Sequence, residues 1–210
     1  PAACADLLIK RKVDIALVPI VVIPNLPDSH IISDYCIGTN GTVDTVCLFS
    51  DVPINEITSI DLDYQSMTSV ALLKFLLKEY WKLDIKLNSL KGGCDSEIKE
   101  NNAALVIGDR AFNLSNKHPY VYDLPAIWNK MTSLPFVFAA WVANKRLPNN
   151  FISDFNSCLK YGLNNINQAL LQEKDSYPHC ENAIDYLNNK ISYNLDSEKL
   201  KSMHFFLKNI

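Results

Sequence analysis

Three hydroxyl residues, Ser66, Thr68 and Ser69, stand between an expected strand and a strongly apolar helix. The first N–H groups of a helix have no partner within the helix, and the helix dipole adds positive potential at that end. Together with the hydroxyl donors, these groups could bind a carboxylate or a phosphate without any lysine or arginine. The alternative is ordinary capping of the helix by Ser66 or Thr68. The three residues therefore predict either an anion site or a simple helix start.

A second candidate is the segment 38–43, which reads G-T-N-G-T-V. Gly41 could let backbone N–H groups approach a ligand closely, and Thr42 could donate a hydrogen bond to it. The alternative is a hairpin turn that joins short strands at 34–38 and 43–49. The sequence alone leaves both interpretations open.

The third candidate is the block I-G-D-R-A at 107–111. Asp109 and Arg110 follow an expected buried strand, and the carboxyl ends of strands open into clefts in α/β folds. Asp109 is therefore a candidate catalytic residue. The alternative for both residues is an ion pair without a role in chemistry.

Several kinds of chemistry have no motif in this sequence. It contains no nucleophile elbow, P-loop, dinucleotide fingerprint or H-E-x-x-H. The cysteines and histidines lie too far apart in sequence for a typical zinc site, so we expect no metal and no cofactor. Buried, reduced thiols are the better interpretation of the cysteines. The residues concerned are Cys4, Cys36, Cys47, Cys94, Cys158, Cys180, His30, His118, His179 and His204.

Composition and charge narrow the class of protein. The 210 residues are 48% hydrophobic and 20% charged, as in a globular domain, and the net charge of −3 argues against a nucleic-acid surface. The longest apolar runs, 13–23 and 134–143, are interrupted or too short to span a bilayer, so no membrane is expected. No signal peptide is visible at Pro1, which favours a cytoplasmic location.

The elements that must position these candidates alternate between strand and helix, which is typical of an α/β fold. The hydrophobic patterns predict strands at 13–18, 34–38, 43–49, 58–63, 84–88, 103–108, 120–123 and 135–142. They predict helices at 2–11, from Ser66 onward, at 94–101 and near 125–132, a loop at 19–33, and an almost wholly helical chain after Pro148.

The strands fall into two sets with long connections at 59–65 and 123–136. A chain that leaves one lobe, builds a second and then returns forms a cleft between them. We expect residues 1–63 and 134–210 to form the first lobe and 64–133 the second. A single continuous sheet is the alternative.

Several blocks taken together resemble the chorismate dehydratase family of the futalosine route to menaquinone. They read V-D-I-A-L-V-P, C-I-G-T-N-G-T-V-D-T-V-C-L-F-S, D-Y-Q-S-M-T-S-V, A-A-L-V-I-G-D-R-A, V-Y-D-L-P-A-I-W and L-P-F-V-F-A-A-W-V. They follow the family's order over about residues 10–145, and each block alone is weak. Two features depart from the family: its first strand, of the S-Y-x-N-T kind with a site Asn, has no counterpart here, and Ser133 replaces a Gly.

The resemblance implies a two-lobed fold of the type II periplasmic-binding-protein kind, with chorismate bound in the cleft. It implies loss of water from chorismate to give 3-[(1-carboxyvinyl)oxy]benzoate, in the cytoplasm and without a cofactor, and it leaves a homodimer open. By match to the S-x-T-S block, the hydroxyls at the helix start would bind a substrate carboxylate. The other residues placed by the resemblance are Gly41, Thr42 and Thr45 on the loop that faces the cleft, and Asp109 in the I-G-D block.

Two rival functions share this fold. The sister enzyme that makes 1,4-dihydroxy-6-naphthoate uses a His in its cleft as base, and no His here lies in a block that matches that role. A non-enzymatic solute-binding protein for small organic anions should carry a signal peptide or a lipobox. The resemblance therefore favours the dehydratase.

Overall fold

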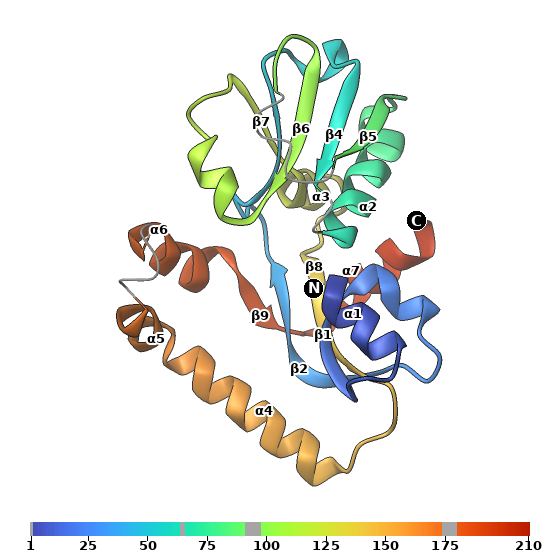
Figure 1. The fold of residues 1–210 in the computed structure, drawn as a ribbon, viewed down its shortest axis with the longest axis vertical. Helices are drawn as coiled ribbons and strands as arrows, with labels where there is room; N and C mark the ends of the chain where they lie inside the picture. The colour runs from blue at the N-terminus through green and yellow to red at the C-terminus, as the bar shows by residue number, and fades with distance from the viewer. Residues whose placement is uncertain (1, 64–65, 91–97, 174–179) are drawn as a thin grey trace.

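The computed structural model describes residues 2–63, 66–90, 98–173 and 180–210, whose strands form two separate sheets (Figure 1). The first sheet has the order β1-β8-β2-β9 and the second has the order β5-β4-β6-β3-β7. The strands are β1 (Ile15–Pro19), β2 (His30–Thr39), β3 (Val46–Ser50), β4 (Ser59–Asp63), β5 (Lys86–Leu90), β6 (Asn102–Ile107), β7 (Tyr120–Asp123), β8 (Phe136–Ala143) and β9 (Ser192–Asn194).

Seven α-helices and several shorter turns of helix lie around the sheets in the described chain. The α-helices are α1 (Ala2–Ile9), α2 (Met67–Leu76), α3 (Leu124–Thr132), α4 (Asn149–Asn164), α5 (Ile166–Gln172), α6 (Cys180–Asp185) and α7 (Ser197–Asn209). The 3-10 turns are η1 (Ile20–Asn25), η2 (Ile54–Glu56) and η4 (Gly108–Asn113), and the π-helical turns are η3 (Leu77–Trp81) and η5 (Tyr186–Lys190).

The apolar strand β8 pairs antiparallel with both β1 and β2 and is the centre of the first sheet. Helix α1 packs against β1, and α7 packs against β8. Because helices cover the sheet, β8 does not alternate between apolar and polar residues as a strand with one solvent-facing side does. The buried strand predicted at 135–142 is therefore confirmed.

In the second sheet, β4 runs parallel to β5 and β6, while β3 runs antiparallel to β6 and β7. Helices α2 and α3 contribute Leu72, Leu76 and Trp128 to the core of one face. The turn η4 contributes Ala111 to a smaller core that includes Phe49 of β3. Helices and a 3-10 turn therefore cover opposite faces of this sheet.

A cluster of four aromatic rings joins the two lobes. Trp128 of α3 lies with its ring centroid 5.4 Å from Phe75 of α2, 5.4 Å from Phe136 of β8 and 5.5 Å from Phe206 of α7. The Trp128 indole N–H donates to the Pro135 carbonyl oxygen at 3.1 Å. Elements of both sheets thus share one buried core, which fixes the lobes against each other on this side.

The predicted assignment of strands to lobes is wrong at one point. Strands β3 and β4 lie within residues 1–63, which we placed in the first lobe, but both pair with β6 in the second sheet. The alternative that a hairpin turn joins 34–38 to 43–49 is also wrong. Strands β2 and β3 belong to different sheets, and the segment between them crosses from one lobe to the other. Local turn residues do not determine which sheet accepts the next strand, and here the buried side chains of β3 favour the second core.

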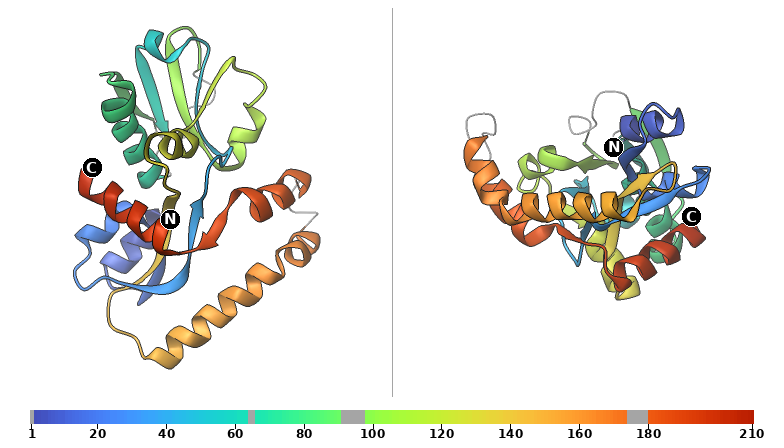
Figure 2. Two further views of the ribbon diagram at one scale, coloured as in Figure 1. Left: turned by 180° about the vertical axis from the view of Figure 1, so that it is seen from behind. Right: turned by 90° about the horizontal axis from the view of Figure 1, so that it is seen from below.

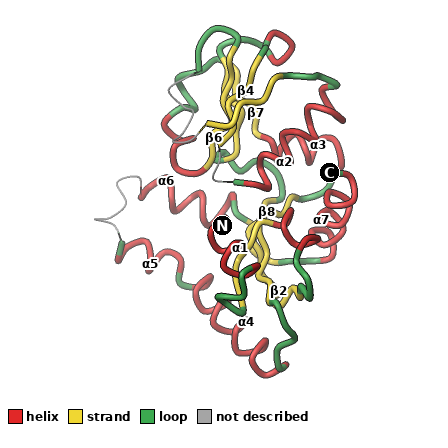
Figure 3. The backbone as a smooth tube through the Cα atoms, turned by 45° about the vertical axis from the view of Figure 1, so that its right-hand side comes forward, coloured by secondary structure: helices red, strands yellow, loops and turns green. Residues whose placement is uncertain are grey.

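Three smaller expectations also differ. The predicted loop at 19–33 contains the 3-10 turn η1 and the start of β2, and the strand β9 interrupts the region expected to be all helix. The helix predicted at 94–101 lies mostly outside the described residues, and its described end is a turn. Figures 2 and 3 show α4, α5 and α6 as an arm beside the first sheet, where α4 packs against β2.

Candidate functional site

The three candidate segments meet at one edge of the second sheet. The parallel strands β4 and β6 end at this edge, and the antiparallel β3 begins there, opposite Ile107. Strand β7 also ends there, because Asp123 pairs with Cys47. We call this the site edge: it carries the start of α2, the segment 40–45 that crosses between the lobes (the crossover loop), and η4.

The start of α2 is a capped helix N-terminus. Ser66 has an extended backbone, accepts a hydrogen bond from the Ser69 N–H at 3.4 Å, and donates through its hydroxyl to the Ser69 hydroxyl at 2.9 Å. The Thr68 hydroxyl donates to the carbonyl oxygen of Phe138 in β8 at 2.9 Å. Thr68 and Ser69 are each only 1% exposed, whereas Ser66 is partly exposed. The capping alternative therefore holds for Ser66, and Thr68 ties α2 to the first sheet.

Capping leaves other donors at this helix start. The backbone N–H groups of Met67 and Thr68 have no hydrogen-bond acceptor within the described part of the chain. A helix of ten residues presents these groups with the positive end of its dipole. The arrangement can therefore still bind an anionic group, with backbone N–H groups as the principal donors.

The start of the crossover loop is shaped by Thr39, the last residue of β2. The Thr39 hydroxyl accepts from the Gly41 N–H at 3.3 Å and donates to the Thr42 carbonyl oxygen at 3.2 Å. Apart from Gly41 and its two chain neighbours, no residue has an atom within 4 Å of the place where a Cβ of Gly41 would stand, and Thr42 is exposed. Thr45 differs, because it is buried and its hydroxyl donates to the Tyr186 hydroxyl at 3.0 Å. Gly41 and Thr42 thus lie open at the site edge, whereas Thr45 holds the loop to η5.

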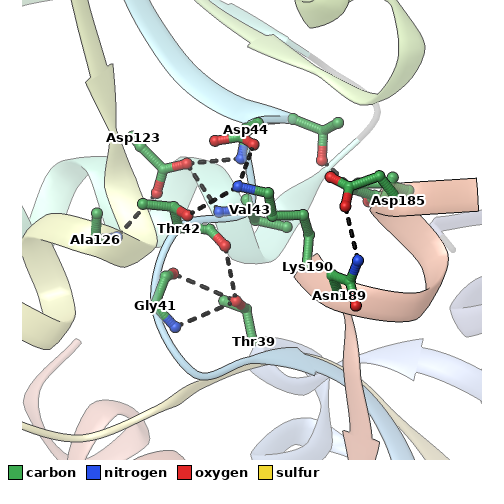
Figure 4. Close-up of polar contacts among 12 residues, drawn as sticks. Thr39, Gly41, Thr42, Val43, Asp44, Asp123, Ala126, Asp185, Asn189 and Lys190 are labelled. Atoms are coloured by element: carbon green, nitrogen blue, oxygen red, sulfur yellow. Dashed lines mark hydrogen bonds and ion pairs between the residues drawn. The ribbon is translucent and has the colours of Figure 1, made fainter. Parts of the chain in front are cut away.

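Two charged residues hold the crossover loop from opposite sides (Figure 4). Asp123, at the end of β7, accepts hydrogen bonds from the backbone N–H groups of Val43 and Asp44. Burial raises the pKa of Asp123, although these donors oppose the shift. Lys190 of η5 forms an ion pair with Asp44 at 2.7 Å, which raises the pKa of Lys190. Asp44, Asp123 and Lys190 also line a pocket of about 460 Å³ beside the loop, together with Tyr186.

The turn η4 contains an exposed acidic residue, Asp109, and a basic residue in an ion pair, Arg110. Asp109 is exposed at the site edge. Arg110 forms an ion pair with Asp63, whose side chain is 0% exposed at the end of β4. Gly108 has a φ of +74° and donates its N–H to the Thr45 carbonyl oxygen at 2.9 Å. Arg110 therefore links the ends of β4 and β6, while Asp109 is left facing solvent.

The site edge contains residues that sequence reasoning did not find. Asp123 stands before Leu124-Pro125, a helix-start pattern that could have marked it as a cap. Nothing in the local sequence marks Lys190 or Tyr186, because they reach the loop from a distant segment. Among the described residues no cluster of three or more His, Cys, Asp or Glu side chains could hold a metal. In the same part of the chain, no helix is both long and apolar enough to cross a membrane.

Solved structures with the same fold define the class of protein. The chain matches protein AF1704 from Archaeoglobus fulgidus with a TM-score of 0.61 and 13% identity, over 98% of this chain and 82% of that one. It matches an ABC transporter from Parabacteroides distasonis with a TM-score of 0.62 and 16% identity, over 99% and 78%. The chain thus has the two-lobed α/β fold of the binding-protein kind, as predicted.

The particular family follows from the sequence. The model of a family described as menaquinone biosynthesis matches residues 1–210, and the chain belongs to that family. The chain is also 30% identical over 166 residues to a chorismate dehydratase of Thermus thermophilus, which covers 70% of this chain. It spans 60% of that relative's length. The predicted family resemblance is therefore confirmed.

Proposed function

We propose that this protein removes water from chorismate to give 3-[(1-carboxyvinyl)oxy]benzoate in menaquinone biosynthesis. The observation that carries the proposal is the meeting of the α2 start and the crossover loop at one sheet edge, in a member of this family. Ser66, Thr68 and Ser69 surround the helix-start donors, and Gly41 and Thr42 lie open on the loop. A cytoplasmic location stays a prediction with this function.

The chemistry of the substrate suits neutral donors. Chorismate carries two carboxylates, and the N–H groups at the start of α2 can hold one of them by charge-assisted hydrogen bonds. In the reaction, the ring carbon that bears the enolpyruvyl ether loses its proton, and the neighbouring carbon loses its hydroxyl. The proton and hydroxide together make the released water. Because the ring becomes aromatic, the protein has mainly to orient the substrate and accept the proton.

Asp109 is our candidate for the proton acceptor. Its carboxylate is exposed at the site edge, beside the end of β6 and one residue from the anchored Arg110. The carboxylates of Asp63, Asp44 and Asp123 already accept from basic side chains or backbone N–H groups. Asp109 is therefore the acid at this edge that is best placed to meet a substrate.

The naphthoate synthase alternative gains no support from the described histidines. His118 lies just before the start of β7, at the opposite end of the second sheet from the site edge. It contacts the Asp51 carboxylate at 2.7 Å. His30 begins β2 in the first sheet, and His204 is exposed on α7. A His-based reaction at the site edge would need a residue outside this set.

Incubation of the purified protein with chorismate tests the proposal. Chromatography should show loss of chorismate and one aromatic product with the mass of chorismate less water. Asp109→Asn should lower the rate at least about 100-fold, as expected for a general base. Asp154→Asn, a matched change on the exposed face of α4, should leave it unchanged. Chorismate that persists beside an active dehydratase control would exclude this function, and saturable binding without turnover would favour a solute-binding protein.

A further inference from the structure

The two carboxylate oxygens of Asp123 do different things. Oδ1 accepts the Ala126 N–H at 2.9 Å and so caps α3. Oδ2 accepts the N–H groups of Val43 at 2.9 Å and of Asp44 at 2.7 Å (Figure 4). One side chain therefore begins a helix of the second lobe and holds two successive peptides of the crossover loop.

Besides Asp123, the crossover loop is tethered at its two ends, by the Thr39 hydroxyl and by Thr45, and the buried Val43 packs into the core. The loop pairs with neither sheet between the end of β2 and the start of β3. On the side away from Asp123, Lys190 pairs with Asp44 and donates to the Thr42 hydroxyl at 3.4 Å. Lys190 reaches the loop through a long side chain that rotates about several bonds, whereas the short side chain of Asp123 receives three backbone donors. Asp123 is thus the more rigid of the two supports.

Holding Val43 and Asp44 also fixes the residues just before them. Two N–H groups directed at one oxygen set the orientation of both peptides, and Asp44 has a left-handed φ of +63°. The preceding pair, Gly41 and Thr42, is joined directly to these two peptides, and Thr42 is exposed while the space beside Gly41 is empty. A loop held in one conformation binds its ligand without the entropic cost of ordering.

We propose that Asp123 is a positioning residue, which holds the crossover loop so that Gly41 and Thr42 contact the substrate. This proposal rests on the proposed function, because it takes chorismate as the substrate of that loop. Asp123 acts through the loop and does not touch the reacting atoms.

Asparagine at this position separates the two tasks of the carboxylate. Its amide has one acceptor oxygen and one donor nitrogen. If the oxygen caps Ala126, the NH₂ group faces the N–H groups of Val43 and Asp44, and donor then meets donor. Asn is a good helix cap, so α3 should keep its start while the loop loses its support. Asp123→Ser provides a second variant, because Ser also caps a helix but is too short to serve both groups.

The first measurement follows the loop itself by amide hydrogen exchange. In Asp123→Asn and Asp123→Ser, the amides of Val43 and Asp44 should exchange at least tenfold faster, while the amide of Ala126 should keep its protection. The matched control is Asp196→Asn, since Asp196 caps α7 through the Lys199 N–H at 2.9 Å, far from the loop in sequence. This control should leave the exchange of Val43 and Asp44 unchanged.

The second measurement is steady-state turnover of chorismate. Loss of loop position should raise KM at least tenfold and change kcat by less than threefold, whereas the Asp196→Asn control should change neither. Unchanged exchange at Val43 and Asp44 would overturn the proposal, and so would faster exchange with an unchanged KM. If the unmodified protein does not turn over chorismate, the proposed function fails, and the exchange measurement alone decides whether Asp123 positions the loop.

Discussion

Replacing Ser66 by aspartate separates the two roles open to the start of α2. Ser66 is the N-cap, and its hydroxyl accepts from the Ser69 N–H and donates to the Ser69 hydroxyl. Aspartate caps a helix as well as serine does, and its charge interacts favourably with the helix dipole. The same charge would repel an anionic substrate group at this helix start. Stability and binding should therefore respond differently to one substitution.

The expected magnitudes are well separated. Ser66→Ala should lower the free energy of unfolding by about 1 kcal/mol through loss of the cap, which lowers Tm by about 2–4 °C in a chain of this size. Ser66→Asp should stay within about 0.5 kcal/mol of the unmodified protein. A substrate carboxylate about 4 Å from the new charge would be repelled by about 4 kcal/mol at an effective dielectric constant of 20. That energy corresponds to a loss of about a thousandfold in affinity.

Thermal unfolding and calorimetric titration with chorismate measure the two quantities separately. Ser197→Asp, in the first turn of α7, is the matched control, because it adds the same charge to a helix start away from the site edge. It should hold or raise stability and leave chorismate affinity unchanged. If Ser66→Asp binds chorismate as tightly as the unmodified protein, the start of α2 is only a capped helix, and the assignment of the substrate carboxylate is wrong.

Two further predictions concern backbone space and thiols. A Cβ added at Gly38 would lie 2.7 Å from the Phe136 carbonyl oxygen, so Gly38→Ala should lower the free energy of unfolding by about 1–3 kcal/mol. Gly41→Ala, where the space is empty, should lower it by less than about 0.5 kcal/mol. Equal denaturation midpoints for the two variants would contradict this. Alkylation of the native protein, followed by peptide mass analysis, should label the exposed thiols and spare the buried ones. Burial raises the pKa of Cys36 to about 12 and also raises the pKa of Cys47, so both thiols stay protonated and unreactive. Labelling of either buried thiol would contradict the structure. Among the cysteines whose side chains the structure describes, the exposed thiols are Cys4 and Cys158 and the buried thiols are Cys36 and Cys47.

Features set by local chemistry were predictable from the sequence. Asp196 caps α7 by accepting from the Lys199 N–H, a role that Asp often has at a helix start, and Ser66 caps α2 where the sequence predicts that a helix begins. The apolar run of β8 is buried on both faces because helices cover the sheet around it. In each case the signal that predicts the feature lies within a few neighbouring residues.

Features set by distant pairing were not predictable. The segment T-N-G-T reads as a hairpin turn, yet the left-handed residue after it is Asp44, with a φ of +63°, and Gly41 has no positive φ. The chain crosses lobes here because β3 finds partners in β6 and β7. Lys190 and Tyr186 reach the loop from a segment more than 130 residues later. No pattern within the crossover loop encodes those partners.

The contacts at the site edge also determine how much the lobes must rearrange to bind a substrate. On one side, the Thr68 hydroxyl holds the start of α2 to Phe138 of β8, and two turns of helix further Phe75 packs into the aromatic cluster with Trp128. On the other side, Asp123 holds the crossover loop. The start of α2 is therefore already held to the first sheet, and the crossover loop is held to the second lobe. Because donors fixed in advance need no ordering on binding, affinity at this site should come from directed N–H groups rather than from a buried positive charge.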